Sequence, residues 1–212
     1  MIFKDRTQAG EQLVPLLEKY KENKEVVVLG LPRGGVVTAF ALAKGLKLPL
    51  DVICLKKIGA PSQPELALGA ISASGETYFN DSLLSSLDIP KNYLDQVTAE
   101  ARKKAEQKEH LYRKSHPAIN LKDKIVILVD DGLATGATMH AAIQTVRAAE
   151  ASSIIVAVPV AAPDSLESIR EEADEVICCD TPFLFAAVGQ FYDDFTGVED
   201  DEVISLLRQS KS

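Results

Sequence analysis

Short apolar runs rich in β-branched residues alternate with helical stretches along the chain, and this alternation limits the possible folds most strongly. Four runs are predicted to be strands, at residues 26–31, 125–129, 154–158 and 176–179. Helical patterns follow the first three, at residues 34–46, 136–150 and 164–172. A continuous apolar run is typical of a strand buried on both faces. The sequence therefore predicts an α/β fold with a mostly parallel central sheet and helices on both faces.

The remaining segments give weaker patterns. Helices are predicted at residues 5–20, where Pro15 is expected to kink or divide the helix, at 90–115 and at 199–209. A further strand is predicted at residues 50–55 and an antiparallel pair at 66–73 and 77–79. Residues 57–65 are predicted to form a loop, because Pro61 and Pro64 interrupt the chain.

Length, charge and cysteine content limit the class of protein. A chain of 212 residues suffices for one α/β domain with a full core. The net charge of −8 argues against a nucleic-acid partner, because nucleic-acid-binding surfaces are usually basic. We find no run of roughly 18 apolar residues for a membrane span, and no secretory signal in residues 1–10. Cys54, Cys178 and Cys179 form no CxxC pair, so we expect reduced cysteines and a cytoplasmic protein.

Residues 126–139 carry the strongest chemical signal. A predicted strand delivers Asp130 and Asp131 to its carboxyl end, and a loop of small residues then leads into a helix. Backbone N–H groups at such a helix start bind anions, and Thr135 and Thr138 add hydroxyl donors. Two acids beside an anion loop suit a sugar phosphate, whose hydroxyls donate to the carboxylates while a divalent metal bridges acids and ligand through water. The ordinary alternative is a strand-to-helix loop capped by Asp and Thr.

This segment resembles the phosphoribosyl pyrophosphate signature of type I phosphoribosyltransferases: four apolar residues, two acids, two mostly apolar residues, a small residue, Thr-Gly, a small residue and Thr. It is neither a Walker A loop nor a dinucleotide fingerprint. The resemblance implies the type I fold, with a small variable hood expected at about residues 180–212 and terminal segments of a single domain, 1–212. It also implies Mg²⁺-dependent transfer of the 5-phosphoribosyl group to a nitrogenous acceptor, a nucleobase by expectation, in nucleotide metabolism. A homodimer is expected only by analogy.

The resemblance also implies roles for the residues of the signature. Asp130 and Asp131 would fix the ribose and hold Mg²⁺ indirectly, through water and ligand oxygens. The 5′-phosphate loop would consist of Gly132, Leu133, Ala134, Thr135, Gly136, Ala137 and Thr138. Family members that act on hypoxanthine and guanine usually carry an Asp where this chain has Ala134, which disfavours a 6-oxopurine acceptor and leaves the acceptor open.

A second motif, residues 30–35 (GLPRGG), follows the first predicted strand. Its Arg33, Gly34 and Gly35 resemble the loop that binds pyrophosphate in this family, often with a non-proline cis peptide. A guanidinium is well suited to phosphate oxygens. A glycine-rich turn into a helix is the ordinary alternative.

A third motif spans residues 55–62, where family members carry a mobile loop that closes over the substrate. Lys56 or Lys57 could neutralise the departing pyrophosphate. Two surface lysines at a strand end are the ordinary alternative. The run from Lys56 through residue 70 resembles an uncharacterised bacterial subgroup of phosphoribosyltransferases, and this resemblance covers most of the chain.

Two other features have a functional and a structural interpretation. Phe191, Tyr192 or Phe195 could stack on a flat ring held by the hood, although packing against the core is an equal alternative. His140 lies just inside the signature helix, where a hydrogen-bonded structural histidine is expected. A non-catalytic sensor of phosphoribosyl pyrophosphate or a nucleotide is the main rival function, and another sugar-phosphate enzyme is the second.

Overall fold

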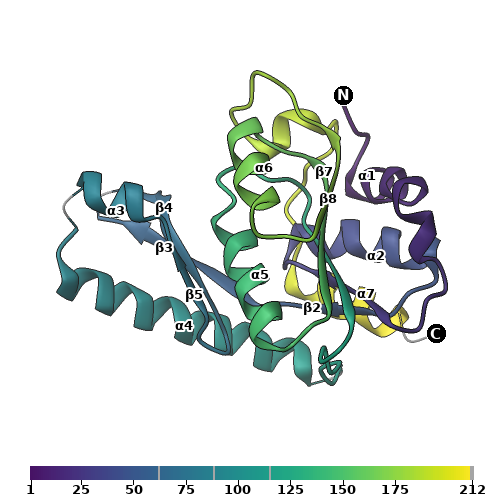
Figure 1. The fold of residues 1–212 in the computed structure, drawn as a ribbon, viewed down its shortest axis with the longest axis horizontal. Coiled ribbons are helices and arrows are strands. Elements are labelled where there is room, and N and C mark those ends of the chain that lie inside the picture. The colour runs from purple at the N-terminus through teal and green to yellow at the C-terminus, as the bar shows by residue number, and fades with distance from the viewer. Residues whose placement is uncertain (62, 88, 115, 211–212) are drawn as a thin grey trace.

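A parallel sheet of five strands forms the centre of the molecule (Figure 1). The structure, a computed structural model, describes residues 1–61, 63–87, 89–114 and 116–210. The strands are β1 (Val26–Gly30), β2 (Leu50–Val52), β6 (Ile125–Val129), β7 (Ser153–Val160) and β8 (Glu175–Asp180), in the spatial order β2-β1-β6-β7-β8. All neighbouring pairs are parallel, so the carboxyl ends of the strands share one edge.

Helices cover both faces of this sheet. The first layer consists of α1 (Arg6–Leu13), the 3-10 helix η1 (Pro15–Tyr20), α2 (Gly34–Leu46) and α7 (Asp200–Gln209), and the second of α5 (Ala137–Ala148) and α6 (Pro163–Arg170). Val26 and Val28 of β1 pack toward the first layer, whereas Val27 and Leu29 pack toward the second. Because successive side chains of a strand point to opposite faces, both faces must be apolar. The predicted fold class is therefore confirmed.

A second, antiparallel sheet forms an arm that extends to one side of the central sheet (Figure 1). We call arm the unit made of β3 (Leu55–Ala60), β4 (Gln63–Ser72), β5 (Thr77–Phe79), α3 (Asp81–Leu87) and α4 (Lys91–Arg113). Its own small core includes Ile58, Leu68 and Ala101. The second half of α4 returns to the main body, where Ala105 and Tyr112 join the core of the first layer.

The arm corrects the predicted loop at residues 57–65, which is wrong. Lys56 and Lys57 lie in β3 and pair with Ile71 and Ala70 of β4, although two lysines and Pro61 are poor strand signals. Pairing with a long strand outweighs local propensity. The predicted strand at 50–55 is also divided, since β2 ends at Val52 and β3 begins at Leu55. The helix α3 was not predicted.

Other predicted elements are confirmed with small shifts of their ends. Pro15 does divide the first helix, because α1 ends at Leu13 and η1 begins at Pro15. The antiparallel pair around Gly75 is β4 with β5, and Gly75 has a φ of +109°, a value that favours glycine. Ser62, at the end of the motif 55–62, and Ser115, at the end of the helix predicted at residues 90–115, lie outside the described residues. Among the described residues, no helix combines the length and apolarity that crossing a membrane requires.

Candidate functional site

The loops after β1 and β6 meet because these two strands are neighbours. Their parallel register pairs Gly30 with Val129, the last residue of each strand. The N–H of Leu31 then donates to the carbonyl oxygen of Val129 at 2.9 Å. Ligands of open α/β sheets bind outside the carboxyl ends of the strands. The order of the strands therefore places two features at one site: the motif that contains Arg33, and the two acids.

Two glycines at the start of α2 admit the two acids. A Cβ atom on Gly34 would lie 2.1 Å from Oδ2 of Asp131, and one on Gly35 would lie 2.6 Å from Oδ1 of Asp130. Only glycine permits carboxylates this close to the start of a helix, where the helix dipole favours negative charge. The peptide bond between Pro32 and Arg33 is cis, as the resemblance implied for this loop.

Asp131 is held by Arg6, a residue that the sequence did not identify. Nε of Arg6 donates to Oδ2 of Asp131 at 2.6 Å, and the two side chains are 11% and 15% exposed. The same guanidinium donates to the carbonyl oxygen of Thr196 at 2.8 Å and lies 3.8 Å from the ring centroid of Phe195. Arg6 thus connects the first helix, the signature and the C-terminal segment. A single arginine in the first turn of a helix gives no sequence signal for this role.

Two of the aromatic residues of the C-terminal segment, Phe191 and Tyr192, pack inside the protein. Phe191 and Tyr192 are buried against Phe3, so the packing alternative holds for both. The O–H of Tyr192 donates to the backbone carbonyl of Asp131 at 2.5 Å. Tyr192 therefore fixes the backbone of the second acid, and its ring is buried by the protein. Phe195 lies between Tyr192 and the guanidinium of Arg6.

Burial raises the pKa values of both acids. The pKa of Asp130 is raised by burial and by the neighbouring charge of Asp131, and the charge of Lys57 opposes this. The pKa of Asp131 is also raised by burial, and its bond to Arg6 opposes the shift. The pair therefore resists carrying two negative charges until a cation or hydroxyl donors approach.

The two carboxylates suit a partly protein-bound magnesium ion. Oδ1 of Asp130 accepts from the N–H of Asp131 at 2.9 Å, and Oδ2 of Asp131 accepts from Arg6. Each carboxylate keeps acceptor capacity for a metal, water or hydroxyl. In the described part of the chain, no group of three or more metal-ligating side chains exists. The two carboxylates fit Mg²⁺, which commonly binds one or two carboxylates and completes its shell with waters and substrate phosphates.

The loop that follows the acids is held by hydrogen bonds to residues at the end of β7 and in α6. Leu133 is buried and bridges to Ala161, with its N–H donating to the carbonyl of Val160 at 2.9 Å. Ser165 donates to the carbonyl of Ala134 at 2.5 Å. Gly136 has a φ of +74° directly before α5. The first N–H groups of a helix lack intrahelical partners, so this end of α5 can bind an anion.

The remaining residues of the loop have distinct surroundings. Thr135 is exposed and Thr138 is half-buried, so their hydroxyls are accessible to a ligand, whereas Ala137 is buried at the first position of α5. A Cβ atom on Gly132 would lie 2.5 Å from Val188, so packing also requires this glycine. His140 bonds Glu172 at 2.9 Å and Ser168 at 3.1 Å, the structural role expected for it.

Arg33 and Lys56 line the same cavity, whereas the charge of Lys57 lowers the pKa of Asp130. Arg33 pairs with Glu199 at 2.9 Å, and the two side chains are 41% and 78% exposed. Such an exposed ion pair is weak and can exchange for a ligand anion. Arg33 and Lys56 line one cavity of about 580 Å³, which also contains the buried thiol of Cys54. Burial raises the pKa of Cys54 to about 12, which makes it a poor nucleophile.

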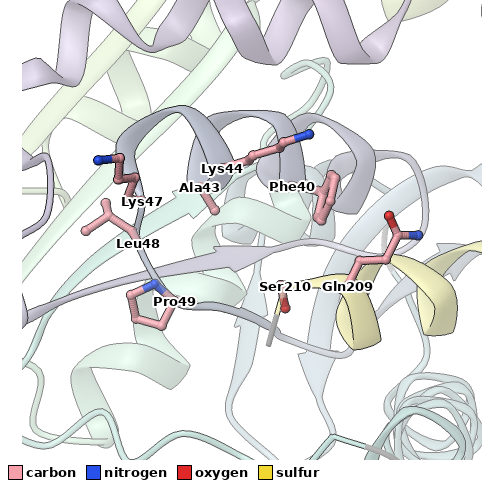
Figure 2. Close-up of a pocket in the computed structure, with 8 residues that line it drawn as sticks. All are labelled: Phe40, Ala43, Lys44, Lys47, Leu48, Pro49, Gln209 and Ser210. Atoms are coloured by element: carbon pink, nitrogen blue, oxygen red, sulfur yellow. The ribbon is translucent and has the colours of Figure 1, made fainter. Parts of the chain in front are cut away.

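A second cavity lies away from these residues. It measures about 710 Å³ and is lined by Phe40, Ala43, Lys44, Lys47, Leu48, Pro49, Gln209 and Ser210 (Figure 2). Pro49 directly precedes β2, so this cavity lies at the amino end of that strand. It contains no residue of the signature, and size alone does not identify the functional site.

Comparisons with known proteins identify relatives of this chain. A sequence model of the family described as phosphoribosyl transferase domain matches residues 73–196, which include the signature but neither Arg33 nor Lys56. The crystal structure of TT1426 from Thermus thermophilus is 40% identical, with a TM-score of 0.83, and covers 99% of each chain.

A relative in Mycobacterium tuberculosis, named "Putative phosphoribosyl transferase MT0597", is 43% identical over 206 residues, 97% of this chain and 46% of the relative. The chain thus spans about half the length of the curated relatives it matches. The AQ2163 protein of Aquifex aeolicus, 16% identical with a TM-score of 0.50 over 83% of this chain and 74% of its own, shares the fold alone. The matched family model, together with relatives of this identity, shows that the chain belongs to the phosphoribosyl transferase domain family.

Proposed function

We propose that this protein is a Mg²⁺-dependent phosphoribosyltransferase that uses phosphoribosyl pyrophosphate and a nitrogenous acceptor, a nucleobase by expectation. One observation carries the proposal: a pair of partly buried acids, the start of α5 and Arg33 lie at one edge of the sheet. A sugar carrying a 5′-phosphate and a pyrophosphate presents complementary groups to each of these three features. Membership in the family supports the same class of reaction.

In the proposed reaction, the bond from C1 of the ribose to pyrophosphate breaks and a bond from C1 to the acceptor nitrogen forms. Asp130 and Asp131 accept hydrogen bonds from the ribose hydroxyls, and the start of α5 holds the 5′-phosphate. Arg33 binds the leaving pyrophosphate, and Lys56 or Lys57 neutralises its charge. Bound Mg²⁺ would supply further neutralisation of the pyrophosphate oxygens. Catalysis then depends mainly on orientation and charge stabilisation.

The acceptor is limited by Ala134, which cannot take a proton. An acceptor nitrogen that loses a proton on transfer must therefore give it to water, to pyrophosphate or to another group. This argues for an acceptor other than a 6-oxopurine, in agreement with the sequence interpretation. Arg6, Tyr192 and Thr196 contact the site from both terminal segments, which supports one catalytic unit over residues 1–212 with a hood from about residue 180. All three cysteines are free, which suits the proposed cytoplasmic location.

The proposal is tested by pyrophosphate release from phosphoribosyl pyrophosphate and Mg²⁺, measured against a panel of purine, pyrimidine and other nitrogenous acceptors. We expect release that depends on one acceptor, together with mass-spectrometric detection of the ribosylated product. Tight binding of phosphoribosyl pyrophosphate with no release for any acceptor would instead support the sensor function.

A further inference from the structure

The cavity that contains Arg33 extends to a face of α4 whose residues have no role in the reaction proposed above. Its charged lining consists of Arg33, Lys56, Lys104, Lys108 and Asp200. These residues come from the loop after β1, the start of β3, the second half of α4 and the start of α7. Lys104 and Lys108 are one helical turn apart on α4, so both side chains can reach the same ligand. The cavity therefore combines the proposed pyrophosphate loop with a cationic helix face.

The charge of this cavity is opposite to that of the chain. Four cationic side chains face one carboxylate there, whereas the whole protein has a net charge of −8. A concave surface lined by charges of one sign concentrates its field on a ligand of the opposite sign. An acidic protein that gathers four cations around one cavity is thus equipped to bind an anion there.

Most of these cations are available to a ligand. Asp200 accepts from the O–H of Tyr112 at 2.6 Å and is also bonded by Lys108, so the carboxylate is held at the wall. Lys56 and Lys104 form no ion pair with any described residue, and Arg33 pairs only with the exposed Glu199. Three cations therefore face the cavity with weak or no internal compensation.

We infer that Lys104 and Lys108 of α4 form, with Arg33 and Lys56, a binding site for a diphosphate anion, and that in catalysis this anion is the pyrophosphate leaving group. The source of the anion rests on the proposed function. The volume of about 580 Å³ leaves room for more than a single phosphate group. Multiple ammonium groups and one guanidinium supply the charge-assisted hydrogen bonds that several phosphoryl oxygens require.

The test is calorimetric titration of inorganic pyrophosphate, with and without Mg²⁺, into the wild-type protein and Lys104→Gln/Lys108→Gln. The matched control is Lys91→Gln/Lys103→Gln, which removes the same charge from exposed positions of α4 outside this cavity. We expect the dissociation constant to rise by about tenfold or more in the cavity variant and by less than about twofold in the control. The salt dependence of binding should also weaken only in the cavity variant.

Two further variants cover failure by misfolding, because Lys108 also bonds Asp200. Lys104→Gln alone should weaken pyrophosphate binding, and Lys104→Arg/Lys108→Arg should retain it. Equal pyrophosphate affinity in the wild type and in Lys104→Gln/Lys108→Gln would overturn the inference even if transfer to an acceptor occurs. Weakened binding in that variant would uphold the site even if no acceptor supports turnover, and in that case only the proposed function would fail.

Discussion

Adding one methyl group at Gly35 should disable the site by steric displacement. The new Cβ atom would lie 2.6 Å from Oδ1 of Asp130, 2.9 Å from its Cα atom and 3.0 Å from the carbonyl oxygen of Val129. The last two are backbone atoms at the end of β6, so they cannot move away by changing a side-chain rotamer. An ordinary contact of 3.4 Å would require Oδ1 to retreat by about 0.8 Å.

The magnitude follows from this displacement. A misplacement of about 1 Å costs on the order of 100-fold in rate, so kcat/KM should fall by about that factor in Gly35→Ala. Overpacking costs about 1–3 kcal/mol, and the helix propensity of alanine offsets up to about 1 kcal/mol of it. For a chain of this length, each 1 kcal/mol lowers Tm by roughly 2–4 °C.

The assay pairs pyrophosphate release with differential scanning calorimetry, and Gly197→Ala is the control. A Cβ atom on Gly197 would meet nothing within 4 Å, so stability should change by less than about 0.5 kcal/mol and turnover should be unaffected. Wild-type turnover and Tm in Gly35→Ala would refute the argument that the start of α2 is shaped around Asp130.

Three further predictions concern the acids and the buried charges. Arg6→Gln breaks a mostly buried ion pair with Asp131, so it should lower the free energy of unfolding by about 3 kcal/mol and weaken the binding of phosphoribosyl pyrophosphate. Unchanged stability in chemical denaturation would contradict this. Asp51→Asn, at a residue 2% exposed and bonded by Arg113, should cost a similar amount, about 3 kcal/mol, but leave that affinity intact, as thermal unfolding and a binding titration would show. Because the folded pKa values of Asp130 and Asp131 are raised, the folded state binds more protons than the unfolded state, so the stability of the unliganded protein should fall as pH rises above the ordinary aspartate range. Asp130→Asn should reduce that pH dependence in denaturant titrations at several pH values.

The central sheet could be predicted from the sequence because strands that are buried on both faces consist of continuous apolar runs. Continuous apolar runs such as β1 and β6 are typical of strands that lie between two layers of helices, and both strands do so here. Once these strands are neighbours and parallel, Arg33 and Asp130 must meet at the same edge, so this part of the site followed from topology.

The arm and Arg6 could not be predicted in the same way. Lys56 and Lys57 occupy a strand only because β4 offers a partner, and partners distant in sequence are invisible to local patterns. Arg6 reaches Asp131 across 125 positions of sequence, and no spacing rule connects them. The role of Tyr192 depends on the hydrogen bond from its O–H to the backbone carbonyl of Asp131, and no local sequence pattern predicts this bond.

The central claim is that Asp130 and Asp131 bind the ribose of phosphoribosyl pyrophosphate together with Mg²⁺. Calorimetric titration of phosphoribosyl pyrophosphate into the wild-type protein and into Asp130→Asn/Asp131→Asn, each with and without Mg²⁺, tests it directly. We expect Mg²⁺-dependent binding to the wild type and a loss of that dependence, with much weaker binding, in the double variant. Equal affinity in both proteins, or no binding to the wild type, would contradict the account.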